Sequence, residues 1–114
     1  PLAKVEGDSQ GDLLVVGWGG TYGSIKSAVA HHRQKGNSVS HLHLRWLNPM
    51  PRNVGEILYK FKHILVPELN LGQLVKVLRA KYLVPAVGLN KIQGLPFKSI
   101  EIENKIEEIL RGTK

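Results

Sequence analysis

Cysteine is absent from this sequence of 114 residues. Its absence excludes disulfide bonds and removes the thiolates that hold most iron–sulfur clusters. The sequence also lacks any apolar run approaching the roughly 20 residues needed to cross a bilayer. No charged leader precedes an apolar segment, so a secretory signal is not predicted. Because the chain begins at Pro1 rather than at Met, we expect it to be a piece of a longer protein. The absence of cysteine is compatible with a reducing compartment, and we expect the protein to be cytoplasmic.

Aromatic residues are scarce, at 6%, and the basic residues form no dense run, although the formal net charge is +7. Proteins that bind nucleic acid gather their basic residues into a patch and stack bases on aromatic rings. The dispersed charges therefore argue against a nucleic-acid partner. They indicate a solvated surface or a face that docks an acidic partner.

The length and the ordinary shares of hydrophobic (42%) and charged (22%) residues fit one globular domain. Residues 1–11 show no apolar periodicity, so we predict a linker or an extended arm there and the domain at 12–114. Apolar runs and alternating segments predict four strands, each followed by a segment with helical spacing. The strands are expected at 13–16, 39–45, 63–66 and 84–87, and the helices are expected to begin near residues 21, 52, 70 and 99.

This alternation predicts an α/β fold. The expected architecture is a three-layer α/β/α arrangement with a mainly parallel sheet of about four to five strands. Pro67 is expected to end the third strand, and residues 88–97 are expected to form a loop. The second helix is expected to reach Phe61. Asn70 and Ser99 are the expected caps of the last two helices.

A glycine-rich turn, Gly17-Trp18-Gly19-Gly20-Thr21-Tyr22-Gly23, joins the first strand to the first helix. Such turns can hold a phosphate on converging backbone N–H groups. The dinucleotide fingerprint is broken, however, because Tyr22 stands where its third glycine belongs. The second strand also ends near Arg45 rather than at an acidic residue that would bind a ribose. We therefore favour a tight packing turn over a nucleotide site.

Two histidines, His41 and His43, lie two residues apart on the second predicted strand and share one face. They could share a metal ion, but no carboxylate or thiolate close in the sequence completes a ligand set. Leu42 and Leu44 occupy the other face, which we expect to be the buried one. The histidines are then expected to face solvent, another domain or a partner, and no metal site is predicted.

Glu68 follows the third predicted strand, and functional groups of open α/β sheets gather at the carboxyl ends of strands. The alternative is a carboxylate held by the backbone donors and the dipole of the next helix. Both interpretations are compatible. No acid–base partner for Glu68 is evident, so the sequence predicts no catalytic residue.

Four blocks of sequence carry a resemblance to a known family. They are similar, in order, to a G-W-G-S-T-Y-G turn (with Gly20 in place of Ser), an L-R-x-L-x-P-L-P segment, a V-E-x-N-x-G-Q-L block and a G-L-N-K-V-Q-G-x-P-F block. The chain thus resembles the carboxy-terminal, transketolase C-terminal-like domain of 2-oxoacid:ferredoxin oxidoreductase alpha subunits, of the 2-oxoglutarate type. The blocks lie at Val16–Gly23, Leu44–Pro51, Val66–Leu74 and Val87–Phe97.

The resemblance implies an enzyme that converts 2-oxoglutarate to succinyl-CoA and CO2 and reduces ferredoxin. Thiamine diphosphate, Mg²⁺ and an iron–sulfur cluster would lie on other domains or subunits, with coenzyme A as co-substrate. The implied partners are the beta subunit, the rest of the alpha subunit and ferredoxin, with no membrane and no nucleic acid. This domain would be structural and inactive alone.

Loops at the strand ends would form its contact surface, and Arg45 and Glu68 would pair with partner charges. Scattered Lys and Arg residues could also hold the phosphates of coenzyme A. Three other interpretations stay open: a pyruvate-specific or other 2-oxoacid member, another transketolase-type enzyme, and a non-catalytic interaction module. The expected contact residues are Gly17, Gly19, Thr21, Tyr22, Arg45, Asn48, Glu68, Asn70, Gly72 and Gln73.

Overall fold

The structure is a computed structural model that describes residues 2–69, 72–91 and 95–112. Its described part forms a five-stranded sheet in the order β1-β3-β2-β4-β5, in which β1 alone is antiparallel to its neighbour. The elements are β1 (Val5–Glu6), β2 (Gly11–Trp18), a 3-10 turn (Gly19–Thr21), α1 (Tyr22–Gln34), β3 (Val39–Leu44), α2 (Val54–Leu58), β4 (Phe61–Leu69), α3 (Gln73–Tyr82), β5 (Val87–Lys91) and α4 (Ser99–Arg111).

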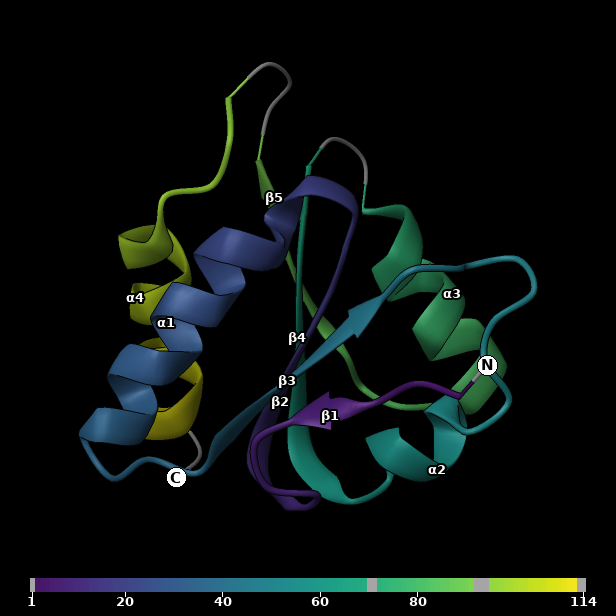
Figure 1. Cartoon of the computed structure of the whole chain (residues 1–114), viewed down its shortest axis with the longest axis horizontal. Helices are drawn as coiled ribbons and strands as arrows, with labels where there is room; N and C mark the ends of the chain where they lie inside the picture. Colours follow the sequence, from purple (N-terminus) through teal and green to yellow (C-terminus); the bar gives the residue numbers. More distant parts are fainter. Residues whose placement is uncertain (1, 70–71, 92–94, 113–114) are drawn as a thin grey trace.

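Helices cover both faces of the sheet: α1 and α4 lie on one face, and α2 and α3 lie on the other (Figure 1). Successive residues of the central strand β2 point into the two cores in turn. Leu14 and Val16 belong to the core under α2 and α3, whereas Leu13 and Val15 belong to the core under α1 and α4. Because a strand covered on both faces buries every side chain, its sequence is a continuous apolar run. The predicted three-layer α/β/α fold is confirmed.

The sheet gains an edge strand inside the segment that we expected to be a linker or arm. Val5 and Glu6 pair with Leu42 and His41 of β3. Two residues are too short to produce a recognisable periodicity, so this strand escapes sequence analysis. The arm therefore lies along the sheet edge and brings residues 2–6 close to the end of β3.

Three predicted boundaries were wrong. β4 continues through Pro67 to Leu69, because β2 pairs with β4 only as far as Leu65 and the strand beyond is free on that side. Proline is tolerated at such edges. β5 begins at Val87 and occupies part of the expected loop. The second helix is the short α2, because Phe61 already belongs to β4. In the described ranges, no helix is long and apolar enough to cross a membrane.

Candidate functional site

The carboxyl ends of β2 and β4 form the place where an open α/β sheet usually binds a ligand. The strand order reverses there, because β3 lies on one side of β2 and β4 lies on the other. Ligands of such folds bind in the crevice at this switch point. In this chain two side chains lie at that position, Trp18 at the end of β2 and Glu68 near the end of β4.

The carboxylate of Glu68 is buried, with 1% of the residue exposed, and it accepts three hydrogen bonds. The backbone N–H of Leu74 donates to Oε1 at 2.7 Å, and that of Val75 donates to Oε2 at 2.9 Å. The indole Nε1 of Trp18 donates to Oε1 at 3.1 Å. Amides in the first turn of a helix lack helical acceptors and favour an anion. The chain's own carboxylate therefore occupies the anion site of α3.

The turn before α3 depends on glycine. Gly72 has φ 70° and ψ 45°, a left-handed conformation that other residues rarely adopt. A Cβ atom there would lie 2.9 Å from the side-chain amide of Asn90. Asn70, the predicted cap, falls outside the described residues, and the residue at the N-cap is Gly72. Glu68 thus supplies, from the preceding strand, the acceptors that a capping side chain would provide.

The glycine-rich turn packs tightly against α1. A Cβ atom on Gly17 would lie 2.3 Å from Cδ1 of Ile25 and 2.9 Å from Oγ1 of Thr21. Thr21 is buried and donates a hydrogen bond to the carbonyl of Trp18 at 3.0 Å. Gly19 adopts a positive φ of 63°. These contacts support the interpretation of this segment as a packing turn.

The remaining predicted contact residues divide by exposure. Arg45, Asn48 and Gln73 are exposed at the carboxyl-terminal side of the sheet. Tyr22, by contrast, is partly buried, and its hydroxyl donates a hydrogen bond to the carboxylate of Glu6 at 3.0 Å. Our expectation that Glu68 pairs with a partner's charge was wrong, because its carboxylate is buried and already hydrogen-bonded.

The prediction that His41 faces solvent, another domain or a partner was also wrong. The residue is 1% exposed, and its ring lies 5.2 Å from that of Tyr22 and 5.8 Å from that of His43. Both ring nitrogens of His41, and Nδ1 of His43, lack a hydrogen-bond partner among the described residues. The prediction assumed one solvated face, but helices cover both faces of this sheet. His43 is half-buried at the same edge.

Burial makes both histidines harder to protonate. It lowers the pKa of His41 to about 4, while the negative charge of Glu6 opposes this change and His43 and Lys26 add to it. Burial likewise lowers the pKa of His43, against the opposing effects of the Gly19 backbone and Glu6. Both rings are therefore neutral at pH 7. No group of three potential metal ligands occurs within residues 2–69, 72–91 and 95–112.

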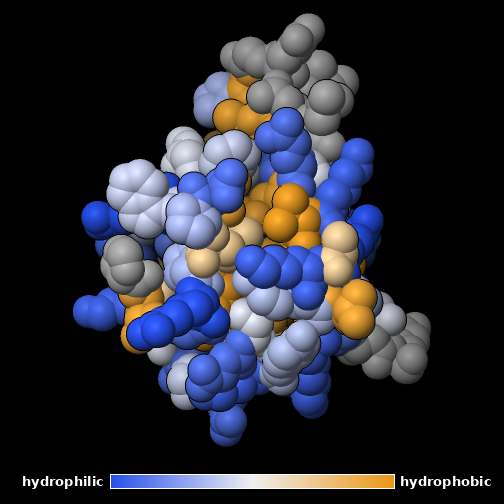
Figure 2. Space-filling view, turned by 90° about the vertical axis from the view of Figure 1, so that its right-hand side faces the viewer, coloured by the Kyte–Doolittle hydropathy of each residue, from blue (hydrophilic) through white to orange (hydrophobic). Residues whose placement is uncertain are grey.

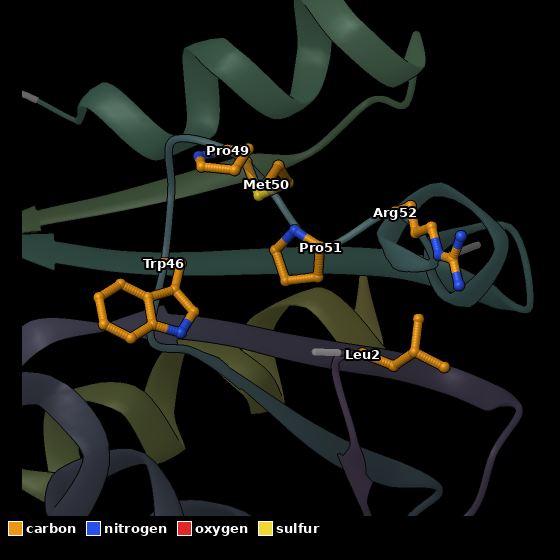
Figure 3. Close-up of a pocket in the computed structure, with 6 residues that line it drawn as sticks. All are labelled: Leu2, Trp46, Pro49, Met50, Pro51 and Arg52. Atoms are coloured by element: carbon orange, nitrogen blue, oxygen red, sulfur yellow. The ribbon is translucent and has the colours of Figure 1, made fainter.

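A second concave surface lies between the amino-terminal arm and the segment that connects β3 to α2. Its volume is about 540 Å³. Figure 3 shows Trp46 and Arg52 toward opposite ends, with Pro51 between them. Sequence analysis missed this site, although a tryptophan in the predicted loop directly after Arg45 was a signal for it. The lining residues are Leu2, Trp46, Pro49, Met50, Pro51 and Arg52.

Comparison with known families gives a match over residues 11–104 to the family described as pyruvate:ferredoxin oxidoreductase core domain II. The chain belongs to this family. It is 47% identical over 107 residues to the 2-oxoglutarate oxidoreductase subunit KorA of Mycobacterium tuberculosis, a match that covers 92% of this chain and 16% of that subunit. It is 32% identical to the 2-oxoglutarate synthase subunit KorA of Archaeoglobus fulgidus, covering 98% of this chain and 31% of that subunit.

Solved structures agree with this assignment. The chain matches 2-oxoglutarate:ferredoxin oxidoreductase from Magnetococcus marinus with a TM-score of 0.89 and 28% identity, over 96% of this chain and 20% of that chain. A split-gene transketolase matches with a TM-score of 0.71 and 16% identity, over 97% of this chain and 42% of that chain, and shares the fold alone. The predicted family and the transketolase C-terminal-like fold are confirmed. The chain therefore spans 16% of the length of the mycobacterial relative.

Proposed function

We propose that this chain is the structural and assembly domain of the alpha subunit of a thiamine diphosphate-dependent 2-oxoglutarate:ferredoxin oxidoreductase. The whole enzyme would convert 2-oxoglutarate, coenzyme A and two oxidised ferredoxins into succinyl-CoA, CO2, two reduced ferredoxins and one proton. The name of the mycobacterial relative supports 2-oxoglutarate as the substrate. The observation that carries the structural role is Glu68, whose carboxylate occupies the backbone donors at the start of α3, where this kind of fold usually binds a ligand.

Three observations support placing the cofactors outside this domain. The backbone donors at the start of α3, which could hold a diphosphate, already bind Glu68. The sequence has no cysteine for an iron–sulfur cluster. Potential metal ligands do not gather in threes in the part of the chain that the structure describes. Thiamine diphosphate, Mg²⁺ and the cluster would therefore lie on other domains or subunits, and coenzyme A would be a co-substrate of the whole enzyme.

The proposed partners are the rest of the alpha subunit, the beta subunit and, for the assembled enzyme, ferredoxin, in the cytoplasm. The relatives are named as subunits of oxidoreductases and synthases, which supports an assembly of several chains. The exposed residues Arg45, Asn48 and Gln73 remain candidates for the contact surface. Dispersed basic residues and few aromatic residues argue against nucleic acid as a partner.

The test uses the full-length chain, co-expressed with its beta partner and loaded with thiamine diphosphate and iron–sulfur cluster. Viologen or ferredoxin reduction is followed with coenzyme A and either 2-oxoglutarate or pyruvate. We expect reduction that depends on 2-oxoglutarate. Reduction with pyruvate alone would keep the family and overturn the substrate. No reduction with either, from a complete complex, would favour a non-catalytic interaction module.

A further inference from the structure

The surface between the arm and the β3–α2 segment combines exposed apolar and basic side chains, and the proposed function assigns it no specific partner. The concave site of about 540 Å³ adjoins a second one of about 600 Å³, which runs along the arm. The two share Leu2, Trp46 and Pro51. We call the combined surface the Trp46 groove. The residues of its lining that define it here are Leu2, Lys4, Glu6, Arg45, Trp46, Pro49, Met50, Pro51 and Arg52.

The groove exposes large apolar side chains to water. Trp46 is 60% exposed and Leu2 is 59% exposed, whereas Met50 is buried in the core below them. Figure 2 shows the face that carries α2 and α3, where apolar surface lies among hydrophilic side chains. A tryptophan side chain can bury some 150–250 Å² on binding. An exposed apolar site with a polar rim is typical of an interaction surface.

Three cations, Lys4, Arg45 and Arg52, are exposed around these apolar residues. No ion pair joins any of the three to a carboxylate of the described residues. Glu6, the acidic residue that lines the same surface, accepts the hydroxyl of Tyr22. The charge of the groove is therefore complementary to an acidic partner.

We propose that the Trp46 groove binds an acidic segment of the same polypeptide, outside these 114 residues, that places a large apolar side chain against Trp46. Carboxylates of this segment would pair with Lys4, Arg45 and Arg52. Tryptophan and arginine are the residues that dominate the energy of protein interfaces. The proposal rests on the proposed function, because it requires this chain to be one domain of a longer subunit.

The choice of the same polypeptide follows from the relatives and from the effect of tethering. The matched region is only 16% of the mycobacterial subunit, so most of such a subunit lies outside this domain. A segment joined to the domain by a short flexible linker is present at an effective concentration in the millimolar range, which favours it over a separate partner.

The first experiment replaces Trp46 with a photo-crosslinking amino acid in the full-length subunit of the purified, active complex. We expect a cross-link to a segment of the same polypeptide that lies outside the 114 residues and contains Asp or Glu. Mixing isotope-labelled and unlabelled subunits separates bonds within one chain from bonds between copies. The matched control carries the same amino acid at Ile100, which is 52% exposed on α4 in the opposite layer. It should not capture that segment.

Several outcomes would overturn the proposal. They are a complex that shows no cross-link at Trp46, a cross-link to another subunit or another copy, and a captured segment without carboxylates. Loss of the cross-link when coenzyme A is added would assign the groove to an anionic small molecule instead. An active complex with any of these results retains the proposed function and loses only the groove assignment. An inactive, fully loaded complex would overturn the proposed function itself.

The second experiment tests the charges. Arg45→Glu combined with Arg52→Glu should lower the cross-linking yield at position 46 about tenfold, since like charges would then face each other. The control pair, Lys35→Glu with Lys60→Glu, changes the net charge equally on exposed residues that do not line the groove. Equal yields from the two pairs would show that the captured segment is not held by its charges.

Discussion

The indole of Trp18 donates a hydrogen bond to Oε1 of Glu68 at 3.1 Å, across 50 positions of sequence. The same oxygen accepts the backbone N–H of Leu74, and Oε2 accepts that of Val75. A single carboxylate therefore joins β2, β4 and the first turn of α3. In this family member the position where an α/β sheet usually binds a ligand contains hydrogen bonds that hold the domain together.

Replacing Glu68 with Gln should lower the free energy of unfolding by about 2–4 kcal/mol. A glutamine side chain has one acceptor oxygen, so it cannot accept from the backbone N–H groups of both Leu74 and Val75. Hydrogen bonds to a charged group contribute about 1.5–3 kcal/mol each. Urea denaturation of the 114-residue chain measures the change. Glu56→Gln, on an exposed position of α2, is the control and should stay within about 0.5 kcal/mol of the wild type. A similarly small change for Glu68→Gln would contradict the role of its carboxylate.

Trp18→Phe tests the same carboxylate from the other strand. This change removes the indole N–H and should cost about 1–2 kcal/mol, because the bonds from α3 to Glu68 remain. The double variant with Glu68→Gln should be less destabilised than the sum of the two single variants, since both remove one shared bond. Strict additivity in a double-mutant cycle would mean that the two residues act independently.

Gly17→Ala should lower the free energy of unfolding by about 1–3 kcal/mol, because overpacking forces neighbours to move. The new Cβ atom would meet Cδ1 of Ile25 at 2.3 Å and Oγ1 of Thr21 at 2.9 Å. Gly23→Ala is the matched control in the same segment. Its Cβ atom meets no described atom within 4 Å, and alanine in a helix should raise stability by about 0.5–1 kcal/mol. Thermal unfolding of both variants measures the two changes in stability. Equal changes in the two variants would contradict the tight packing around Gly17.

The layers of the fold could be predicted because the central strands are covered on both faces. The run Leu13–Val16 is fully buried and is followed directly by Gly17, so it can be recognised as a strand without knowledge of its neighbours. The short β1 could not be predicted, because its pairing with β3 depends on contacts over more than 30 positions. β5 was misplaced because Gly88 and Asn90 are weak strand formers.

The candidate site was predictable in part. Glu68 was recognised as a carboxylate near a helix start, but its bond to Trp18 joins residues 50 positions apart and leaves no local signal. His41 was misjudged because alternation along one strand cannot reveal which helix covers the polar face. The Trp46 groove arises from the arm folding back beside the segment after β3, which again is a long-range contact.

The buried His41 should make the stability of the domain depend on pH. Its pKa is about 4 in the folded chain, whereas an exposed histidine titrates near the ordinary value of 6.5. Between these values the unfolded chain binds the proton and the folded chain does not. Acid therefore favours the unfolded state, so stability falls as the pH decreases from 6.5 toward 4. The lowered pKa of His43 acts in the same direction.

His41→Leu should remove part of this dependence. Leucine leaves no unpartnered ring nitrogen and no group to protonate at this position, so the variant should be at least as stable as the wild type at pH 7.5. At pH 5 the stability difference between the variant and the wild type should be larger, in favour of the variant, by about 2 kcal/mol than at pH 7.5. The reason is that one unit of pKa shift corresponds to about 1.4 kcal/mol. Urea denaturation at both pH values measures the two differences. Parallel losses of stability in the two proteins on acidification would show that His41 is not the group that titrates.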